Sequence, residues 1–137
     1  MTDDQLREIL TKTKSIAVVG ASPNSSRPSH GVTGFLVSKG FQVFAVNPGH
    51  AGKVINGAMT YASLNDLPKA MDMIDVFRAS EFVSDVVDAV MDLSWKPKVI
   101  WTQLNVRDDA AADRARSAWI TVVQDKCPAI EMPRLGL

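Results

Sequence analysis

The sequence contains little cysteine, and neither sign of charge is in excess. Cys127 is the single cysteine among 137 residues, so no disulfide can form within the chain, which is typical of a reducing compartment. The 15 basic residues are balanced by 15 acidic ones. Proteins that bind DNA or RNA normally carry a clustered basic face, and we therefore expect no nucleic-acid partner.

Long hydrophobic runs and a targeting signal are also lacking. The apolar runs are far shorter than the roughly 20 residues that a membrane helix needs. The first residues, Met1–Gln5, are acidic and polar, whereas a secretory signal begins with basic residues and continues with apolar ones. We therefore expect a cytoplasmic protein without a membrane partner. With 46% apolar and 22% charged residues, the composition suits one globular domain over residues 1–137.

What the chain does contain is an alternation of short apolar runs with longer amphipathic stretches. Five runs rich in valine, isoleucine or phenylalanine predict strands that are covered on both faces, as in a parallel sheet. These runs are Ser15–Val19, Phe41–Val46, Met73–Phe77, Lys98–Thr102 and Ile120–Gln124. We predict an α/β fold, a single-domain Rossmann-like three-layer sandwich with helices on both faces of a five-stranded parallel sheet. Numbered along the chain, the expected strand order is 3-2-1-4-5.

The stretches between these runs predict helices with recognisable ends. Thr2 and Gln5 have the spacing of a capping box, and Ser29 is placed to cap a helix that ends near Lys39. Asp108 or Asp109 is placed to cap a helix that runs to Ala118. The remaining expectations are a helix over Glu81–Leu93 and an irregular stretch, Ala51–Ala70, that contains one short helix at Leu64–Leu67.

In such a sheet, ligands bind beyond the carboxyl ends of the strands, where the winding direction reverses. The expected order places this point between the strands Ser15–Val19 and Lys98–Thr102. The loops that would surround it are Gly20–Pro28, Asn47–Gly57, Arg78–Ser80, Gln103–Arg107 and Asp125–Glu131.

The first of these loops has the composition of a phosphate cradle. Gly20 allows close approach of a ligand, Ser22 and Ser25 offer hydroxyls, and Arg27 offers a forked cation that suits phosphate. The helix that follows presents free backbone N–H groups. The alternative is a polar loop whose serines only cap turns. Lys53 in the second loop is either a further phosphate contact or a solvent-exposed lysine.

The same loop lacks the dinucleotide fingerprint G-x-G-x-x-G. Ser22 and Ser25 stand at the second and third glycine positions, and Asn47 follows the second strand where a dehydrogenase usually has an acidic residue. Both departures count against NAD. A small NAD(P)-binding oxidoreductase or regulator is therefore the alternative hypothesis.

An ordered set of segments resembles the CoA-binding domain family, small proteins similar to the N-terminal domain of the succinyl-CoA synthetase α subunit. The segments are Ile16–Ser22, Arg27–Ser29, Gly40–Val43, Val46–Pro48, Gly57, Tyr61–Leu64, Asp75–Arg78, Trp101–Gln103 and Asp125–Glu131. The resemblance extends over nearly the whole chain, from about Ser15 to Leu135.

The resemblance implies a site for coenzyme A (CoA) along the strand ends. Phosphates would lie on the loop that begins at Gly20, and the nucleotide would border the second loop. The residues after the third strand would form another wall of the site, and the pantetheine arm would pass the end of the fourth strand. The residues implied are Gly20, Ala21, Ser22, Ser25, Arg27, Asn47, Pro48, Phe77, Arg78, Trp101 and Gln103. The family usually has glycine where this chain has Asn105, and asparagine is the next-best residue for a left-handed backbone conformation.

Binding is implied more strongly than catalysis. The synthetase reacts through a phosphorylated histidine in a second domain, and we expect no such domain here. Asp72 and Asp75 are interpreted as a loop end and a strand edge, not as an acid–base pair. Cys127 is either an inert small hydrophobe or a reactive thiol near the CoA sulfur. We expect a non-enzymatic protein that binds CoA or a short acyl-CoA as a carrier, sensor or accessory subunit; a homo-oligomer and a partner subunit are both left open.

Overall fold

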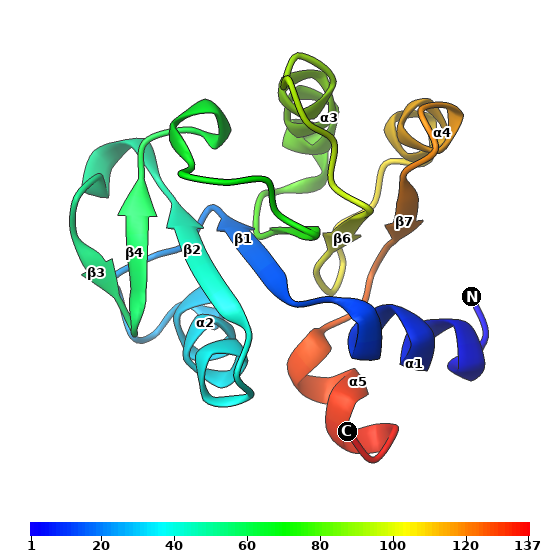
Figure 1. Ribbon diagram of the computed structural model, residues 1–137, viewed down its shortest axis with the longest axis horizontal. Coiled ribbons are helices and arrows are strands. Elements are labelled where there is room, and N and C mark those ends of the chain that lie inside the picture. The colour runs from blue at the N-terminus through cyan, green and yellow to red at the C-terminus, as the bar shows by residue number, and fades with distance from the viewer.

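The computed structural model describes all residues, 1–137, and contains one seven-stranded sheet between two layers of helices (Figure 1). The strands are β1 (Ser15–Val19), β2 (Gln42–Val46), β3 (Val54–Ile55), β4 (Ala58–Tyr61), β5 (Met73–Val76), β6 (Val99–Thr102) and β7 (Thr121–Val123). Their order is β3-β4-β2-β1-β5-β6-β7, and only β3 and β4 pair in antiparallel fashion. The α/β class and the mostly parallel, Rossmann-like sheet are therefore confirmed.

The predicted number of strands is wrong, because β3 and β4 lie in the stretch that was expected to be irregular. They form a tight hairpin whose turn is Asn56-Gly57, and both residues have positive φ angles, +43° and +94°. This dipeptide is a strong hairpin signal in sequences. Its strands are too short, and β4 is too mixed in polarity, to stand out by hydrophobic pattern alone.

The predicted strand order is wrong in its assignments. The run at Met73, expected beyond the second strand, forms β5 and pairs directly with β1. The position beyond β2 belongs to β4. If only the parallel strands are numbered along the chain, their order is 3-2-1-4-5-6. The sheet is therefore doubly wound, as expected, but its third parallel strand is β4 and not the strand at Met73. The winding therefore reverses between β1 and β5, not between β1 and the strand at Lys98–Thr102.

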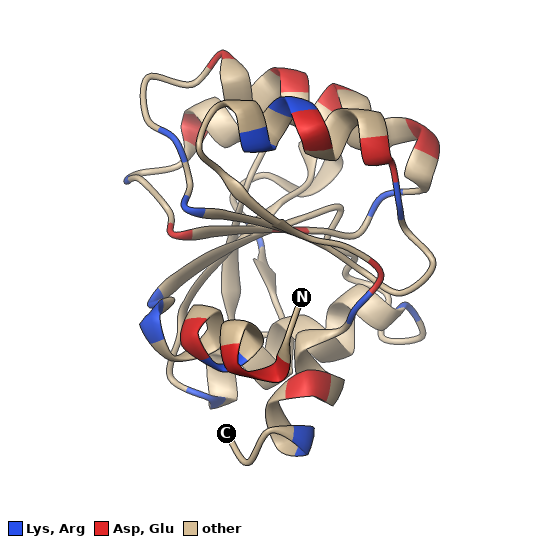
Figure 2. Ribbon diagram, turned by 90° about the vertical axis from the view of Figure 1, so that its right-hand side faces the viewer, with Lys and Arg blue, Asp and Glu red and all other residues tan.

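Two apolar clusters hold the helices to the sheet. The helices are α1 (Asp3–Lys12), α2 (Pro28–Ser38), α3 (Val83–Met91), α4 (Asp109–Ser117) and α5 (Pro128–Arg134), with short 3₁₀ turns η1 (Pro48–His50), η2 (Leu64–Asp66) and η3 (Ser80–Phe82). α3 and α4 cover one face, and α1, α2 and α5 cover the other (Figure 1). All five residues of β1 are buried, as expected for a central strand. Figure 2 shows the sheet edge-on, with acidic and basic residues interspersed on the helices of both layers.

The helix ends follow most of the sequence signals. The Thr2–Gln5 capping box is present, and the Asp108 side chain accepts a hydrogen bond from the Ala111 N–H at 3.0 Å. The expected Ser29 cap is wrong: Arg27 is the N-cap residue of α2, and Ser29 is buried within the first turn. Helix α5 replaces most of the loop expected at Asp125–Glu131. None of the helices has both the length and the apolar character that crossing a lipid bilayer requires.

The β3–β4 hairpin is fastened to α2 through one side chain. Asn56 Nδ2 donates to the carbonyl oxygen of His30 at 2.8 Å, and it lies against Gly34. A Cβ atom at position 34 would overlap the Asn56 amide group. The absence of a side chain at Gly34 therefore allows the hairpin to pack closely on α2.

Candidate functional site

The reversal of winding between β1 and β5 opens a groove at the carboxyl edge of the sheet. The groove has a volume of about 400 Å³ and lies between the ends of β1, β2 and β4 and the flank of α3. Val46, Leu64 and Val86 supply apolar walls. Four of the residues singled out in the sequence line it: Gly20, Asn47, Pro48 and Arg78.

Gly20 forms the sharp turn where the chain leaves β1. Its φ is +85°, and a Cβ atom there would lie 2.5 Å from the carbonyl oxygen of Phe77. The sequence predicts that this glycine allows close approach of a ligand. The structure shows a different need, because the backbone of the neighbouring β5 strand already fills the space that a side chain would occupy.

Asn47 joins the loops that follow β1 and β2. Its Nδ2 donates to the Ala21 carbonyl oxygen at 2.8 Å, and its Oδ1 accepts the Gly49 N–H at 2.9 Å. Both ends of the side-chain amide are therefore engaged inside the protein. Asn47 shapes the groove, while Pro48 beside it is exposed at the rim.

The loop from Ala21 to Arg27 is organised by its own polar groups. The Ser22 N–H donates to Ser29 Oγ at 3.0 Å, and Ser22 Oγ accepts the Asn24 N–H at 3.1 Å. Ser25 is exposed, and its hydroxyl makes no hydrogen bond within the protein. No side chain caps the start of α2, and its first turn contains no acidic residue. The loop is thus held in shape while donors remain available at a helix N-terminus, which is the arrangement that binds anions.

The arginines divide into two groups. The chain has seven arginines, and five of them form ion pairs with Asp or Glu: Arg7, Arg107, Arg114, Arg116 and Arg134. Arg27 and Arg78 have no acidic partner. Both follow strands that meet at the reversal point, Arg27 after β1 and Arg78 after β5. Arg78 stacks on the Phe82 ring with its guanidinium carbon 4.4 Å from the ring centre, a contact that orients the cation without neutralising it.

Lys53 and Phe77 lie outside the groove lining, as do Ala21, Ser22, Ser25 and Arg27 of the first loop. Lys53 is exposed just before β3 and makes no ion pair. Phe77 is half-buried and packs against the cluster on the α1–α2–α5 face, although its backbone abuts Gly20.

Trp101 and Gln103 lie beneath the surface of the same edge. Trp101 is fully buried, and its indole Nε1 donates to the Lys126 carbonyl oxygen at 2.9 Å. Gln103 is buried, and its Nε2 donates to Asp75 Oδ1 at 2.8 Å. Neither side chain reaches the groove. They instead tie β6 to its neighbours under the loop that follows it.

The prediction that Asp75 lies at a strand edge is wrong. It lies on β5, between β1 and β6, and its side chain is fully buried. Oδ2 has no hydrogen-bond partner. Burial raises the pKa of this carboxyl to about 7, and the Gln103 hydrogen bond only partly opposes that effect. An aspartate inside an otherwise apolar strand was the available signal.

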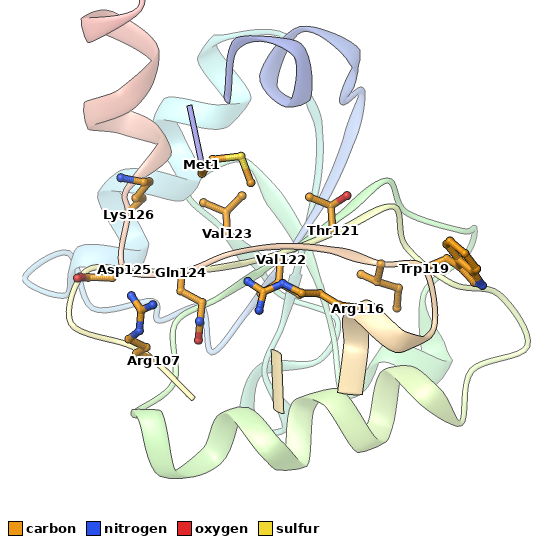
Figure 3. Close-up of a pocket in the computed structure, with 11 residues that line it drawn as sticks. Met1, Arg107, Arg116, Trp119, Thr121, Val122, Val123, Gln124, Asp125 and Lys126 are labelled. Carbon is orange, nitrogen blue, oxygen red and sulfur yellow. The ribbon is translucent and has the colours of Figure 1, made fainter. Parts of the chain in front are cut away.

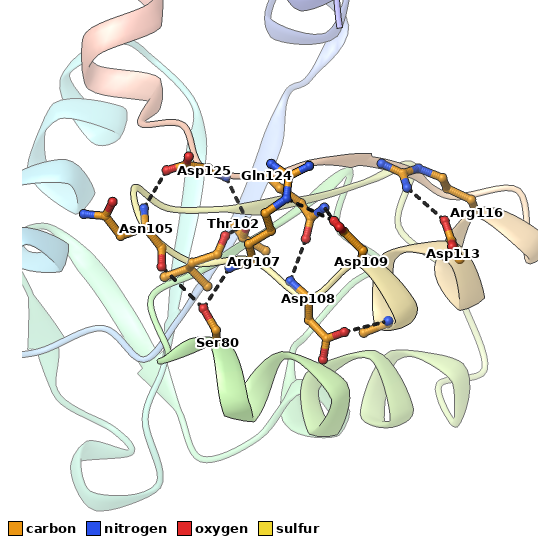
Figure 4. A network of polar contacts seen from close by, with 12 residues as sticks. Ser80, Thr102, Asn105, Arg107, Asp108, Asp109, Asp113, Arg116, Gln124 and Asp125 are labelled. Carbon is orange, nitrogen blue, oxygen red and sulfur yellow. Dashed lines mark hydrogen bonds and ion pairs between the residues drawn. The ribbon is translucent and has the colours of Figure 1, made fainter.

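A polar network fixes the loops that follow β6 and β7 (Figure 4). Asp125 Oδ1 accepts the Asn105 N–H at 2.6 Å, and Ser80 Oγ accepts the Arg107 N–H at 2.9 Å. Asn105 has a φ of +65°, so the expected left-handed conformation is confirmed. The loop thus keeps a glycine-like turn without glycine.

The structure favours the inert interpretation of Cys127. The residue is buried against the cluster on the α1–α2–α5 face. Burial is the main effect that raises the pKa of its thiol. A thiol with a raised pKa holds little of the reactive thiolate at neutral pH.

Comparison with known proteins gives the family. The sequence profile described as "CoA binding domain" matches residues 14–133, most of the chain. The chain belongs to the CoA binding domain family. A Bacillus subtilis (strain 168) relative, the uncharacterized protein YneT, is 29% identical over 123 residues, which cover 90% of this chain and 88% of that protein.

Solved structures agree with this membership. A Thermus thermophilus protein, described as cell-free ID.343, superposes with a TM-score of 0.91 at 37% identity. The superposition covers 98% of this chain and 99% of the Thermus chain. A hypothetical protein from Pyrococcus horikoshii OT3 superposes with a TM-score of 0.90 at 33% identity and covers 100% and 94%. Both proteins thus share the whole fold of this chain.

Proposed function

We propose that the protein binds CoA or a short acyl-CoA at the carboxyl edge of the sheet and catalyses no reaction on its own. The observation that carries the proposal is the pair Arg27 and Arg78. They are the arginines without acidic partners. Arg78 lines the groove, and Arg27 is the N-cap residue of α2, on the loop that leaves β1. Guanidinium groups form strong, often bidentate contacts with phosphate, and CoA is rich in phosphate.

The groove suits the nucleotide end of such a ligand. Apolar walls from Val46, Leu64 and Val86 can cover one face of an adenine, while Pro48 and Arg78 border the entrance. The uncapped start of α2 lies after the same turn and supplies backbone donors to a phosphate. Membership of the CoA binding domain family supports this ligand class over other nucleotides.

The pantetheine arm would run across the outer surface of the loop after β6. Because Trp101 and Gln103 are buried, they would support this loop from below and would not contact the arm directly. The rigid turn at Asn105 gives the arm a fixed surface to cross. The proposed role is that of a carrier, sensor or accessory subunit acting in the reducing conditions of the cytoplasm.

Calorimetric titration with CoA tests the proposal. Arg27→Ala and Arg78→Ala should each weaken binding about tenfold or more, since hydrogen bonds to charged groups are worth ~1.5–3 kcal/mol. Arg114→Ala is the matched control, because this arginine already pairs with Asp88 between α3 and α4. An acyl-CoA incubated with the wild-type protein should be recovered unchanged. Binding of NAD or NADP without binding of CoA would overturn the proposal in favour of the alternative hypothesis.

A further inference from the structure

A second surface feature lies at the opposite side of the sheet from the hairpin, along the free edge of β7. A groove of about 600 Å³ follows this strand, flanked by Met1 and Arg116, with Trp119 at one end and Asp125 and Lys126 at the other (Figure 3). β7 is the last strand of the sheet and pairs only with β6. Its outer edge therefore presents backbone groups that no other strand uses.

The backbone hydrogen bonds show which groups face outward. The Thr121 N–H donates to the Lys98 carbonyl oxygen, so Thr121 and Val123 face β6. Alternate residues in a strand point to opposite edges, which turns the N–H and C=O groups of Val122 to the open side. The Gln124 N–H also has no acceptor, whereas the Ile120 N–H is used by Ala115 and leaves only its carbonyl oxygen free.

Trp119, directly before β7, is the most exposed large apolar side chain of the protein. Its side chain is 95% exposed, and its φ of +66° is an unfavourable backbone conformation for a bulky residue. Tryptophan is enriched among the residues that carry most of the binding energy of protein interfaces. Here the residue contributes nothing to the core that would compensate for its strained backbone.

We propose that two copies of this chain pair through their β7 edges in antiparallel fashion, about a two-fold axis at Val122. In this register the two Val122 residues exchange both of their backbone hydrogen bonds. Each Gln124 N–H faces the free Ile120 carbonyl oxygen of the other copy. Every outward-facing donor along the strand thus meets an acceptor, and the arrangement is isologous, as a two-fold interface requires.

The charges at the groove suit a second copy. Each cationic side chain that lines it already pairs with a carboxylate of its own chain: Arg107 with Asp109, Arg116 with Asp113, and Lys126 with Glu131. Asp125 is the lining carboxylate without a cationic partner. Antiparallel pairing brings Asp125 of one copy to the Arg116–Trp119 end of the other, where the exposed indole can cover the turn at Asp125–Lys126.

Sedimentation velocity from micromolar to submillimolar protein tests this pairing. The wild type should show a concentration-dependent dimer, and Trp119→Gly should weaken dimerisation by about tenfold or more. Because glycine suits a positive φ, this variant should unfold no more easily than wild-type monomer. Ile130→Ala, which removes another exposed apolar side chain outside the groove, is the matched control and should leave the dimer unchanged.

Hydrogen exchange supplies an independent measurement. The amides of Val122 and Gln124 should become protected as protein concentration rises, while the Thr121 amide is protected at every concentration by its bond to Lys98. A wild-type protein that stays monomeric throughout the range would overturn the proposal. A dimer in which Val122 and Gln124 exchange freely would overturn it equally, since that dimer would use another surface.

Discussion

The side chain of Asn47 links the ends of two neighbouring strands, because its Nδ2 donates to the Ala21 carbonyl oxygen while its Oδ1 accepts the Gly49 N–H. In dinucleotide-binding folds an acidic residue commonly holds the ribose at this place. In this protein the residue at that place instead holds together the two loops that border the groove. The absent carboxylate is therefore a consequence of how the two loops are joined.

Asn47→Asp should not convert the protein to NAD binding. A carboxylate cannot donate to the Ala21 carbonyl oxygen, and the loss of this hydrogen bond should lower the free energy of unfolding by about 1 kcal/mol. CoA affinity should fall with it, because both loops border the groove. Urea unfolding and calorimetry with CoA and NAD measure these effects; unaltered CoA affinity would mean that the link does not shape the site.

Gly20→Ala should destabilise the fold even without ligand. The new Cβ would collide with the Phe77 carbonyl oxygen and force a strained φ, at a cost of about 2 kcal/mol or more. Gly31→Ala in α2 is the control: nothing lies near its added Cβ, and alanine should stabilise the helix by up to about 1 kcal/mol. The urea midpoints of the two variants should shift in opposite directions. Equal shifts would contradict the conclusion that the Phe77 backbone leaves no room for a side chain at position 20.

Asp75 should make the stability fall as pH rises from about 4 to 7. The folded-state pKa is about 7, above the unfolded value of 3.8, so the folded protein retains a proton that the unfolded chain releases. The stabilising effect is complete below the unfolded pKa and is lost as pH passes the folded one. At about 1.4 kcal/mol per pKa unit, the change amounts to roughly 4 kcal/mol.

Asp75→Asn should remove most of this pH dependence, because asparagine is neutral throughout and its Oδ1 can still accept from Gln103. Urea midpoints measured between pH 4 and 8 compare the variant with the wild type. Asp92→Asn, which changes an exposed aspartate at the end of α3, should leave the wild-type profile intact. If the Asp75→Asn variant kept the wild-type slope, another group would have to be the source.

Cys127 should react slowly with a thiol reagent in the folded protein at neutral pH. Burial limits access and raises the pKa of the thiol. The reaction should be fast in urea. In the folded protein, its rate should be limited by the local unfolding that exposes the thiol. Rapid labelling of the folded protein, equal to that of the unfolded chain, would instead identify a reactive thiol.

The parallel strands were predictable because each is an apolar run covered on both faces. β3 and β4 were not, since residues as few as Val54–Ile55 give no periodicity, although Asn56-Gly57 marks their turn. Because β4 is absent from the expected set of five strands, the run at Met73 takes the third position in the expected order. In the structure β4 holds that position, and the run at Met73 forms β5 beside β1.

The candidate site could be predicted in part. Gly20, Asn47, Pro48 and Arg78 do line one groove, since strand ends in a doubly wound sheet meet at one edge. The burial of Trp101 agrees with a strand that is covered on both faces, and only the family resemblance placed this side chain beside the ligand. The isolation of Arg27 and Arg78 from acidic partners appears only once all the ion pairs are placed.

Two guanidinium groups without acidic partners lie on the loops that follow β1 and β5, and the first of these loops leads into an uncapped helix start. Such a spot attracts small polyanions of many kinds. Sulfate or phosphate in a buffer should therefore compete with a nucleotide for it, and material purified from cells should arrive partly occupied. Affinities determined in chloride or acetate after extensive desalting should exceed those determined in phosphate.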